Sequence, residues 1–365
     1  MYKSHVYDVV LSTYGILSSE ETSLSDKKWG TVCLDEAHVI KNKDTKMSQA
    51  VMMLNAECRI ILTGTPIQNH LGELWNLFRF INPGLLGSDE SFRRKFVVPI
   101  QEHDKERQRA LQRIIKPFML RRTKTEVADD LPDKTDIVMP VELSDAEMAM
   151  YEAMRVKAAN MLENADKVDV NTLAEITRLR RAADSIKLVD PEWKGPESKI
   201  NAFIDLVEEF RTGSNRMLVF SQFTSYLALV KEALDKAGIR YLYLDGSCSM
   251  KERERLVSEF RKGEVPLFII SLKAGGLGLN LPEANYVAHL DPWWNPAIEQ
   301  QATDRAYRIG QKRNVTVYHF VSKNTIEEKI RRLHRTKLDL ADSLLEGTDM
   351  ASKLGVKEIL ELVNS

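Results

Sequence analysis

Two groups of polar residues, far apart in the chain, have the composition that phosphoryl transfer needs. The first is Asp35-Glu36-Ala37-His38, which directly follows the apolar run 31–34. The second contains Arg305 and Arg308 and is preceded by Gln300. Phosphoryl transfer needs a carboxylate to hold Mg²⁺, a polar group to orient the attacking water, and cations to stabilise the transferring phosphate. The two groups together predict an ATPase whose catalytic site forms only when two lobes close.

The adjacent acids of the first group can divide two tasks between them. Successive side chains at a strand end point in different directions. We therefore assign Asp35 to Mg²⁺ and Glu36 to the attacking water. The alternative interpretation is that both are solvated acids at the boundary between a strand and a loop.

A second polar segment, Leu62 to Asn69, follows the next predicted strand. Gly64 is expected to permit a tight turn, and Pro66 is expected to fix the chain direction. The hydroxyls of Thr63 and Thr65 are expected to report the state of the γ-phosphate to the other lobe. The alternative is an ordinary junction of a strand, a turn and a helix.

The two arginines are three residues apart on a predicted helix, which would place Arg305 and Arg308 on one face. An arginine inserted from a second domain can accelerate phosphoryl transfer by roughly 10³ to 10⁵. The alternative is a surface ion pair with the neighbouring Asp304.

A glycine-rich segment, Ser271 to Leu281, follows a predicted strand in the second half of the chain. Glycines let backbone amides approach a phosphate or a DNA backbone closely. Ligands bind at the carboxyl ends of strands in such sheets, although a plain turn is the alternative. A later segment, Asp291 to Pro296, pairs two tryptophans between prolines, and we expect them to pack in a seam rather than to contact DNA.

The apolar runs before these segments predict two α/β lobes. In the first lobe the strand candidates are 7–11, 31–34 and 59–62, with a helix over 45–54. In the second lobe they are 216–220, 241–244, 266–270, 286–290 and 315–321. Helices are expected between the latter, over 198–211, 223–237, 250–262 and 296–306. Short apolar strands alternating with helices predict doubly wound parallel sheets.

Charged, mainly helical sequence lies between the lobes, beginning with residues 88–130. A capping box at Ser144 predicts a helix from Asp145 to about Glu163, and another helix is expected over 171–187. A second capping box at Thr325 opens a long helix that is expected to reach about Leu345.

Composition leaves the chemical class open but restricts the setting. The 365 residues are enough for about two domains. No apolar run approaches the roughly 18 residues of a membrane span. The three cysteines lack metal-ligand spacing, and the two in or near predicted strands are expected to be buried and reduced, which indicates a reducing compartment. The net charge of −1 neither favours nor excludes nucleic acid, and basic clusters such as Arg93-Arg94-Lys95 are interpreted as solvated helix faces.

One motif is missing from the sequence. No stretch reads G-x-x-x-x-G-K-[S/T], the loop that cradles nucleotide phosphates. The α/β pattern therefore starts without its expected first strand and phosphate loop. We expect the chain to be a fragment, a truncated product or one of two polypeptides, with weak ATP binding and slow or absent turnover by itself.

The ordered motifs resemble those of superfamily 2 helicase-type motors. The shared motifs are Asp-Glu-Ala-His at 35–38, Leu-Thr-Gly-Thr-Pro at 62–66, Leu-Val-Phe-Ser-Gln-Phe at 218–223, the glycine-rich segment, and the segment with Gln300 and the two arginines. Four further segments, 7–10, 117–124, 244–247 and 291–296, resemble the SWI/SNF-type branch with its Rad54-like and prokaryotic relatives. The resemblance covers nearly the whole chain.

This resemblance implies two RecA-like lobes with helical protrusions, ATP and Mg²⁺ between them, and movement along double-stranded DNA without strand separation. It implies that Asp35, Glu36 and His38 serve the metal, the water and coupling, and that Gln300, Arg305 and Arg308 complete the site with the arginines as fingers. The residues implied to couple the lobes are Thr63, Gly64 and Thr65. The residues implied to lie near nucleic acid are Gln68, Asn69, Lys273, Gly275, Gly276 and Asn280.

The resemblance also implies a division of the chain. The expected segments are a partial first lobe over 1–82, a helical protrusion over 83–136, a second protrusion with the linker over 137–197, a second RecA-like lobe over 198–325, and a helical extension over 326–365. The phosphate loop of the family is expected upstream of Tyr7.

Two other functions remain open from the sequence: a strand-separating DNA or RNA helicase, and a catalytically inactive nucleic-acid-binding fragment. The expected partners are double-stranded DNA and DNA-bound protein complexes that the motor displaces, with no membrane. The short linker favours a prokaryotic protein near the nucleoid in the cytoplasm, or a nuclear protein if the source is eukaryotic.

Overall fold

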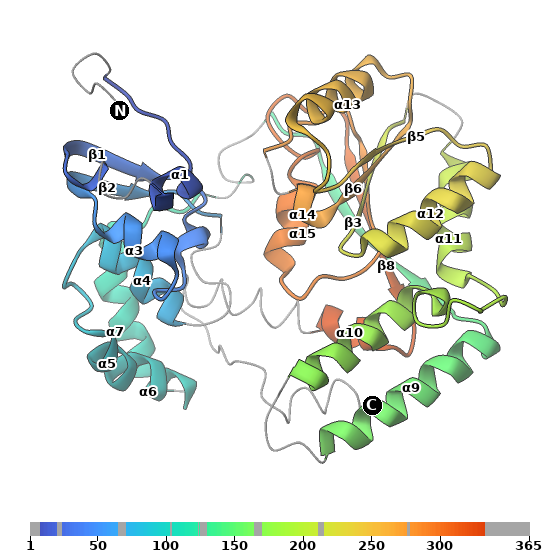
Figure 1. The fold of residues 1–365 in the computed structure, drawn as a ribbon, viewed down its shortest axis with the longest axis horizontal. Helices are drawn as coiled ribbons and strands as arrows, with labels where there is room; N and C mark the ends of the chain where they lie inside the picture. The colour runs from blue at the N-terminus through green and yellow to red at the C-terminus, as the bar shows by residue number, and fades with distance from the viewer. Residues whose placement is uncertain are drawn as a thin grey trace. The chain divides into compact units, whose positions relative to one another are not determined.

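The computed structural model contains two compact units (Figure 1). The described residues are 8–19, 24–64, 71–102, 104–122, 124, 130–163, 170–210, 215–275 and 278–332. Unit 1 comprises the described residues up to Leu120, and unit 2 comprises those from Arg121 to Arg332. No helix among the described residues is both long enough and apolar enough to cross a membrane.

Unit 1 contains a two-stranded parallel sheet, in which β1 (Lys28–Leu34) pairs with β2 (Asn55–Ile61). Side chains alternate along β1, so that Val32 and Leu34 turn inward while Thr31 and Cys33 are exposed. The connection between the strands contains the 3₁₀ helix η1 (Ala37–Ile40) and α3 (Lys46–Met52). The parallel pairing and the helix expected over 45–54 are confirmed.

Two expectations for unit 1 are wrong. The predicted strand over 7–11 is not formed by its described residues, because Val9 and Leu11 are 75% and 92% exposed and no described strand pairs with them. Cys33 and Cys58 are exposed rather than buried, because both lie on the outward face of this small sheet.

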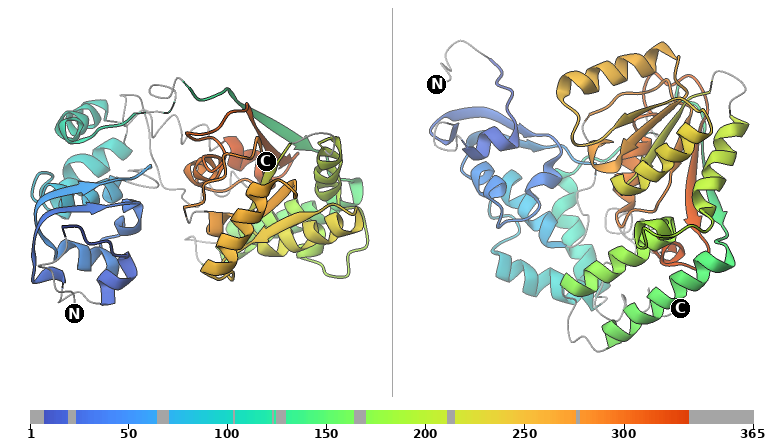
Figure 2. Two further views of the ribbon diagram at one scale, coloured as in Figure 1. Left: turned by 90° about the horizontal axis from the view of Figure 1, so that it is seen from above. Right: turned by 45° about the vertical axis from the view of Figure 1, so that its right-hand side comes forward.

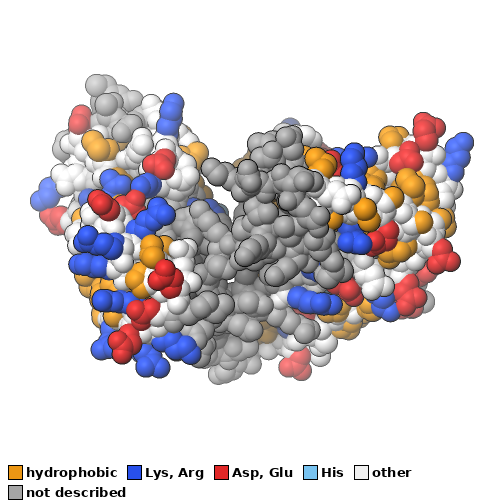
Figure 3. All heavy atoms as spheres, turned by 90° about the horizontal axis from the view of Figure 1, so that it is seen from below, with side chains coloured by type: hydrophobic (Ala, Val, Ile, Leu, Met, Phe, Trp, Pro, Cys, Tyr) orange, Lys and Arg blue, Asp and Glu red, His pale blue; other side chains and the backbone are white. Residues whose placement is uncertain are grey.

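Helices form the rest of unit 1. They are α1 (Tyr14–Ser19), α4 (Leu71–Ile81), α5 (Asp89–Phe92), the π-helix η2 (Arg93–Val97), α6 (Val98–Gln101), α7 (Lys105–Ile115) and the 3₁₀ helix η3 (Lys116–Phe118). Helices α4 to α7 share a core that includes Phe78, Phe92 and Leu111, whereas Leu17 of α1 packs in a second core with Leu34 of β1. Arg93-Arg94-Lys95 is exposed, and Figure 3 shows basic side chains interspersed with acidic ones over unit 1, on the left. This mixture favours the solvated-face interpretation.

Unit 2 is built on a six-stranded parallel sheet in the order β3-β8-β7-β4-β6-β5. The strands are β3 (Lys134–Val141), β4 (Met217–Ser221), β5 (Tyr241–Leu244), β6 (Leu267–Ser271), β7 (Tyr286–His289) and β8 (Val315–Ser322). Every residue of β4 and β6 is buried, as both faces of a central parallel strand require. The doubly wound parallel fold expected for the second lobe is confirmed.

Strand β3 was not expected. Its first residues, Lys134-Thr135-Asp136, are polar, and Pro140 lies inside it. Proline is tolerated because β3 is an edge strand that pairs only with β8. The boundary expected between 136 and 137 therefore falls inside a strand of the unit 2 sheet.

Helices cover both faces of this sheet (Figure 2). The helices on one face are α11 (Ser198–Glu209) and α12 (Thr224–Lys236), and those on the other face are α13 (Met250–Lys262) and α15 (Pro296–Thr303). Alternate strand residues serve the two faces, since Val219 packs with α11 and α12 while Phe220 packs with α13. This alternation explains why the strands are apolar throughout.

Two long helices, α9 (Asp145–Glu163) and α10 (Val170–Asp184), form a separate pair with their own core. The capping box expected at the start of α9 is formed. The Ser144 backbone N–H donates to Glu147 Oε2 at 2.9 Å, and the Glu147 backbone N–H donates to Ser144 Oγ at 3.3 Å. The structure describes the helix expected from Thr325 onward only as far as Arg332.

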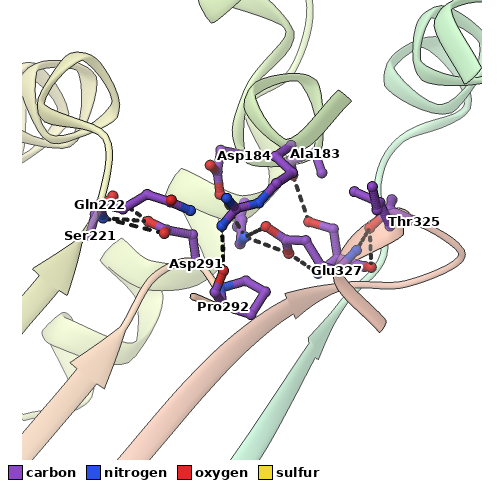
Figure 4. Close-up of polar contacts among 12 residues, drawn as sticks. Ala183, Asp184, Ser221, Gln222, Asp291, Pro292, Thr325 and Glu327 are labelled. Atoms are coloured by element: carbon purple, nitrogen blue, oxygen red, sulfur yellow. Dashed lines mark hydrogen bonds and ion pairs between the residues drawn. The ribbon is translucent and has the colours of Figure 1, made fainter. Parts of the chain in front are cut away.

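A buried ionic cluster joins this helical pair to the sheet (Figure 4). Lys199 Nζ lies 2.9 Å from Asp184 Oδ1 and 2.7 Å from Glu327 Oε2, and all three side chains are at most 1% exposed. Burial would lower the pKa of Lys199, but Asp184 and Glu327 outweigh it and raise that pKa. Burial raises the pKa of Asp184, Lys199 opposes the rise and Glu327 adds to it. The Lys199 ammonium is thus the counter-charge of two buried carboxylates.

We predict that Lys199→Met destabilises unit 2 strongly, because it leaves two buried acids without their counter-charge. The expected loss is about 3–5 kcal/mol of unfolding free energy. Hydrogen-exchange protection of the β8 amides measures it. Lys323→Met is the control, since Lys323 pairs with Glu142 at an exposed site at 2.6 Å. A loss no larger than that of the control would contradict the role given to the cluster.

Two histidines stack on neighbouring strands of this sheet, His289 on β7 and His319 on β8. The centroids of the His289 and His319 rings lie 5.2 Å apart, and the angle between the ring planes is 12°. Burial lowers the pKa of His289 to about 3. Burial would also lower the pKa of His319, but its hydrogen bonds to Asp136 and Glu299 outweigh burial and raise it, although Arg331 opposes the rise. His289 is thus held neutral, and His319 favours its charged form.

The two histidines predict pH dependences of opposite sign. Protonated His319 stabilises the fold fully below the ordinary histidine pKa of about 6.5, and this stability is lost as pH rises through its raised folded pKa. His319→Gln should therefore cost more unfolding free energy at pH 6 than at pH 9. The stability that neutral His289 gives the fold is lost as pH falls from about 6.5 towards 3. The unfolding free energy that His289→Gln costs should therefore shrink on acidification. Urea unfolding of both variants as a function of pH measures the two effects. The same pH dependence of the unfolding free energy in both variants would contradict the assignment.

Candidate functional site

The acidic group of unit 1 lies at the carboxyl end of β1. Asp35 is exposed, while Glu36 and His38 are half-buried. The Glu36 backbone N–H donates to Asp35 Oδ1 at 2.9 Å, and His38 Nδ1 lies 3.2 Å from Glu36 Oε2. The three predicted residues are therefore brought together, with the two carboxylates differently engaged. This difference agrees with giving them different tasks.

The backbone at Glu36 is left-handed, with φ 48° and ψ 49°. This region is uncommon for a residue with a side chain and is concentrated at functional sites. Residues of other segments hold this turn in place. The Ala37 N–H donates to Leu62 O, which follows β2, at 3.0 Å. From α4, Asn76 Nδ2 donates to Ile40 O at 2.6 Å. These contacts fix the direction in which Asp35 and Glu36 leave the strand.

Tyr14 is a neighbour of the acidic group that the sequence did not reveal. Its hydroxyl donates to the Asp35 main-chain carbonyl at 2.8 Å. Burial, and then the charges of Asp35 and Glu36, raise the pKa of Tyr14 to about 12. The phenol therefore stays a neutral donor at physiological pH. In the sequence Tyr14 is an aromatic residue about twenty positions before the acidic group and belongs to no motif, so nothing there marks it as a neighbour of Asp35.

The segment that begins at Thr63 leaves the same edge of the sheet. Leu34 and Ile61 are paired residues, and the Leu62 N–H donates to Leu34 O at 2.8 Å. Thr63 is half-buried one residue later. Gly64 has no left-handed φ, and a Cβ there would meet nothing within 4 Å, so this backbone does not require glycine. The remaining predicted residues of the segment, Thr65, Gln68 and Asn69, lie outside the described residues.

In unit 2 the two arginines lie beyond the helix rather than on it. Helix α15 ends at Thr303. Residues 304–311, which we call the arginine segment, follow it with turns and a bend and without helix. Gly310 has φ +100°, which a continuing helix cannot accommodate. The turns still bring the arginines together, because Nη1 of Arg305 and Nη1 of Arg308 each lie 3.4 Å from Leu279 O. The expected shared face is thus produced by a turn.

Several main-chain contacts hold the arginine segment. The Leu281 N–H donates to Arg305 O at 2.9 Å. Gln311 is buried, and its Nε2 donates to Ala306 O at 3.1 Å and to Ala284 O at 2.7 Å. Gln311 therefore fastens the segment to the turn that precedes β7.

The glycine-rich segment starts at the end of β6 as the short helix α14 (Leu272–Gly275), which contains Lys273 and Gly275. Gly276 lies outside the described residues. Gly278 has φ +70°, so at this position the chain uses the conformational freedom of glycine. Asn280 is exposed, and its carbonyl accepts from Arg261 Nη2 at 2.9 Å. The segment thus runs from a strand end to the carbonyl of Leu279 that both arginines contact.

Gln300 contacts the arginine segment rather than pointing away from it. Its Nε2 donates to Asp304 Oδ1 at 2.9 Å. The Asp304 carboxylate, which the alternative interpretation pairs with the arginines, is also engaged by Lys124, whose Nζ lies 2.7 Å from the same oxygen. Lys124 belongs to the segment 117–124, whose role in this site the sequence did not reveal.

Asp291 is a second residue that sequence reasoning did not assign. It is 1% exposed at the end of β7 and accepts from the Ser221 hydroxyl and the Gln222 backbone N–H at the end of β4 (Figure 4). Burial raises its pKa, although the Ser221 hydrogen bond and then Arg180 oppose the rise. Asp291 therefore fixes two adjacent strand ends at the edge where the glycine-rich segment leaves.

The tryptophans of the segment 291–296 pack against the protein. Trp293 contacts the core shared with α13, and Trp294 contacts the core of α9 and α10. The guanidinium of Arg180 lies 5.0 Å from the centroid of the Trp294 ring. These contacts favour the packing interpretation.

Sequence comparisons identify both halves of the chain. The profile of the SNF2-related domain matches residues 2–188, and that of the helicase conserved C-terminal domain matches residues 198–310. The chain is 39% identical to the Bacillus subtilis putative ATP-dependent helicase/translocase YwqA over 97% of this chain and 40% of that protein. It is 34% identical to the Mycoplasma genitalium ATP-dependent helicase MG018 over 99% of this chain and 35% of that protein.

Structural comparison agrees with the sequence comparisons. The SWI2/SNF2 ATPase core of Sulfolobus solfataricus, in a structure with double-stranded DNA, matches with a TM-score of 0.52 and 33% identity over 98% of this chain and 75% of that chain. The chain spans two fifths or less of the two bacterial relatives. The expected RecA-like α/β class is thereby confirmed, and the chain belongs to the SNF2-related family of helicase-type ATPase cores.

Proposed function

We propose that this chain supplies the motor of an ATP-driven translocase that moves along double-stranded DNA. The observation that carries the proposal is the convergence of Arg305 and Arg308 on one carbonyl at the end of the glycine-rich segment. Two guanidinium groups held at the same carbonyl repel each other, and an anion such as a phosphate offsets that repulsion. The family supports ATP as the source of that phosphate.

The donors of unit 1 fit Mg²⁺. Asp35 offers an exposed carboxylate at a strand end, and no group of three or more acidic, histidine or cysteine ligands occurs among the described residues. Mg²⁺ suits such a place, because it keeps several waters and usually takes one or two carboxylates together with substrate phosphates. We assign Asp35 to hold it, where Mg²⁺ would neutralise charge on the phosphate oxygens.

Glu36 and His38 act on the water that attacks the phosphate. The Glu36 carboxylate is held by His38 at 3.2 Å and by a left-handed backbone, so it is oriented before substrate binds. We assign Glu36 to orient the water and His38 to couple that carboxylate to the chain that follows. Arg305 and Arg308 then stabilise the charge that develops on the transferring phosphate.

The remaining predicted residues act in coupling and in DNA contact. We assign the coupling of the lobes to Thr63, Gly64 and Thr65, which would communicate the state of the γ-phosphate to the other lobe. The reason is that Thr63 follows its strand beside Asp35. We assign Gln68, Asn69, Lys273, Gly275, Gly276 and Asn280 to the DNA backbone. The double-stranded DNA in the Sulfolobus solfataricus structure supports duplex DNA as the track, and DNA-bound proteins are the proposed cargo to be displaced.

We predict that the protein in its full natural length hydrolyses ATP and that Arg305→Ala or Glu36→Gln lowers turnover by at least about 10²-fold. Each substitution removes a group that acts on the transferring phosphate or on the attacking water. Steady-state phosphate release measures the effect. Arg240→Ala is the matched control, because Arg240 lies at the amino end of the edge strand β5, where its Nη2 donates to the Glu264 carbonyl at 2.7 Å. Undiminished turnover in the first two variants would overturn the assignment.

We also predict that duplex DNA stimulates this hydrolysis more than single-stranded DNA does, and that a forked duplex is not separated. A translocase that tracks an intact duplex needs both strands, whereas a strand-separating helicase holds one. Turnover with each DNA and a strand-displacement assay measure the two properties. Displacement with a preference for single strands would favour the helicase function, and binding without hydrolysis would favour a non-catalytic fragment.

A further inference from the structure

Lys124 lies where the chain has just passed into unit 2. The units divide between Leu120 and Arg121, so Lys124 is the fourth residue of unit 2. Its ammonium nitrogen lies 2.7 Å from Asp304 Oδ1 and donates to Tyr307 O at 2.6 Å. The same ammonium lies 5.5 Å from the centroid of the Tyr307 ring. One side chain thus contacts the arginine segment from a position 183 residues before Tyr307.

The two contacts of Lys124 bracket the first arginine. Asp304 immediately precedes Arg305, and Tyr307 immediately precedes Arg308. The Asp304 carboxylate is held twice at one oxygen, by Lys124 and by Gln300 Nε2 at 2.9 Å. The Leu281 N–H also donates to Arg305 O at 2.9 Å. The backbone that carries both arginines is therefore held by contacts from two separate parts of the chain.

An ordinary surface ion pair does not explain this arrangement. The side chains of Lys124 and Asp304 are 37% and 33% exposed, and such a pair by itself contributes little to stability. The ammonium, however, also bonds a main-chain carbonyl, using a second of its three donors. A bond to the main chain restrains the turn itself, whereas a carboxylate contact restrains only a side chain. The turn is what brings Arg305 and Arg308 to the same carbonyl.

We propose that Lys124 is a positioning residue that latches the arginine segment in the form in which Arg305 and Arg308 converge. The proposal rests on the function proposed above, in which these arginines stabilise the transferring phosphate. In this role Lys124 acts through the arginine segment and not on the nucleotide or the metal.

The test compares Lys124→Met, Lys124→Arg and a matched control in the protein of full natural length. Lys323→Met is that control, because Lys323 is 39% exposed and its ammonium pairs with Glu142. We expect Lys124→Met to lower kcat for ATP about five- to tenfold with KM changed less than twofold, because misplaced catalytic groups slow the reaction without weakening ground-state binding. Lys124→Arg should recover most of kcat, since a guanidinium can also reach both a carboxylate and a carbonyl.

A second readout separates positioning from folding. Lys124→Met should weaken binding of ADP with aluminium fluoride, a mimic of the transferring phosphate, by about the same factor as kcat, while ATPγS binds as in the natural protein. If Lys124→Met melts at a lower temperature than Lys323→Met, Asp304→Asn carries the test. That substitution keeps the size of the side chain and weakens the ion pair but leaves the bond to the Tyr307 carbonyl. It should therefore lower kcat less than Lys124→Met does, and it should add little to the loss in Lys124→Met, because both weaken the same ion pair.

The outcomes distinguish this proposal from the one on which it rests. Suppose that the natural protein is active and that Arg305→Ala abolishes turnover. If the kcat of Lys124→Met then equals that of the control, the role proposed for Lys124 alone is overturned. A loss confined to KM, or no recovery with Lys124→Arg, overturns it as well. Failure of the natural protein to hydrolyse ATP, or indifference to Arg305→Ala, instead overturns the proposed function.

Discussion

Parallel strand pairing is the constraint from which the rest of the structure follows. In a parallel sheet all carboxyl ends lie at one edge, so residues that follow different strands become neighbours. In unit 1 the pairing of Leu34 with Ile61 sets Asp35 beside Thr63. In unit 2 the pairing of β7 with β4 sets Asp291 beside Gln222. In unit 2 the strands beneath this edge are fully buried, as β4 and β6 show, and so provide a firm base for its polar groups.

Polar contacts, rather than apolar burial, determine the geometry at these edges. Asp291 joins the ends of β4 and β7, Gln311 joins the arginine segment to the turn before β7, and Lys124 grips that segment from the chain that enters unit 2. The buried cluster of Lys199 performs the same task for the helical pair. Such bonds are directional and costly to leave unmade in a dry interior, so they select one arrangement among many that apolar packing would tolerate.

Most of the fold was predictable because it depends on local patterns. The apolar runs that became β4 to β8, the helices between them and the capping box at Ser144 all carry their signal within a few residues. The edge strand β3 escaped prediction because its polar start and Pro140 resemble a loop, and only pairing with β8 makes it a strand. The run 7–11 was predicted as a strand from the same kind of pattern, but no described strand pairs with it.

The sequence by itself determined the family and indicated the chemistry proposed for this protein, since the acids after β1, the glycine-rich segment and the two arginines are recognisable from residue type and order. Only the tertiary structure decided how those residues are held. The arginines meet through a turn, not a helix face, and Tyr14, Asp291 and Lys124 support the site from distant positions. The reason is physical: a motif records what a side chain can do, whereas its orientation depends on hydrogen bonds between residues that folding alone brings together.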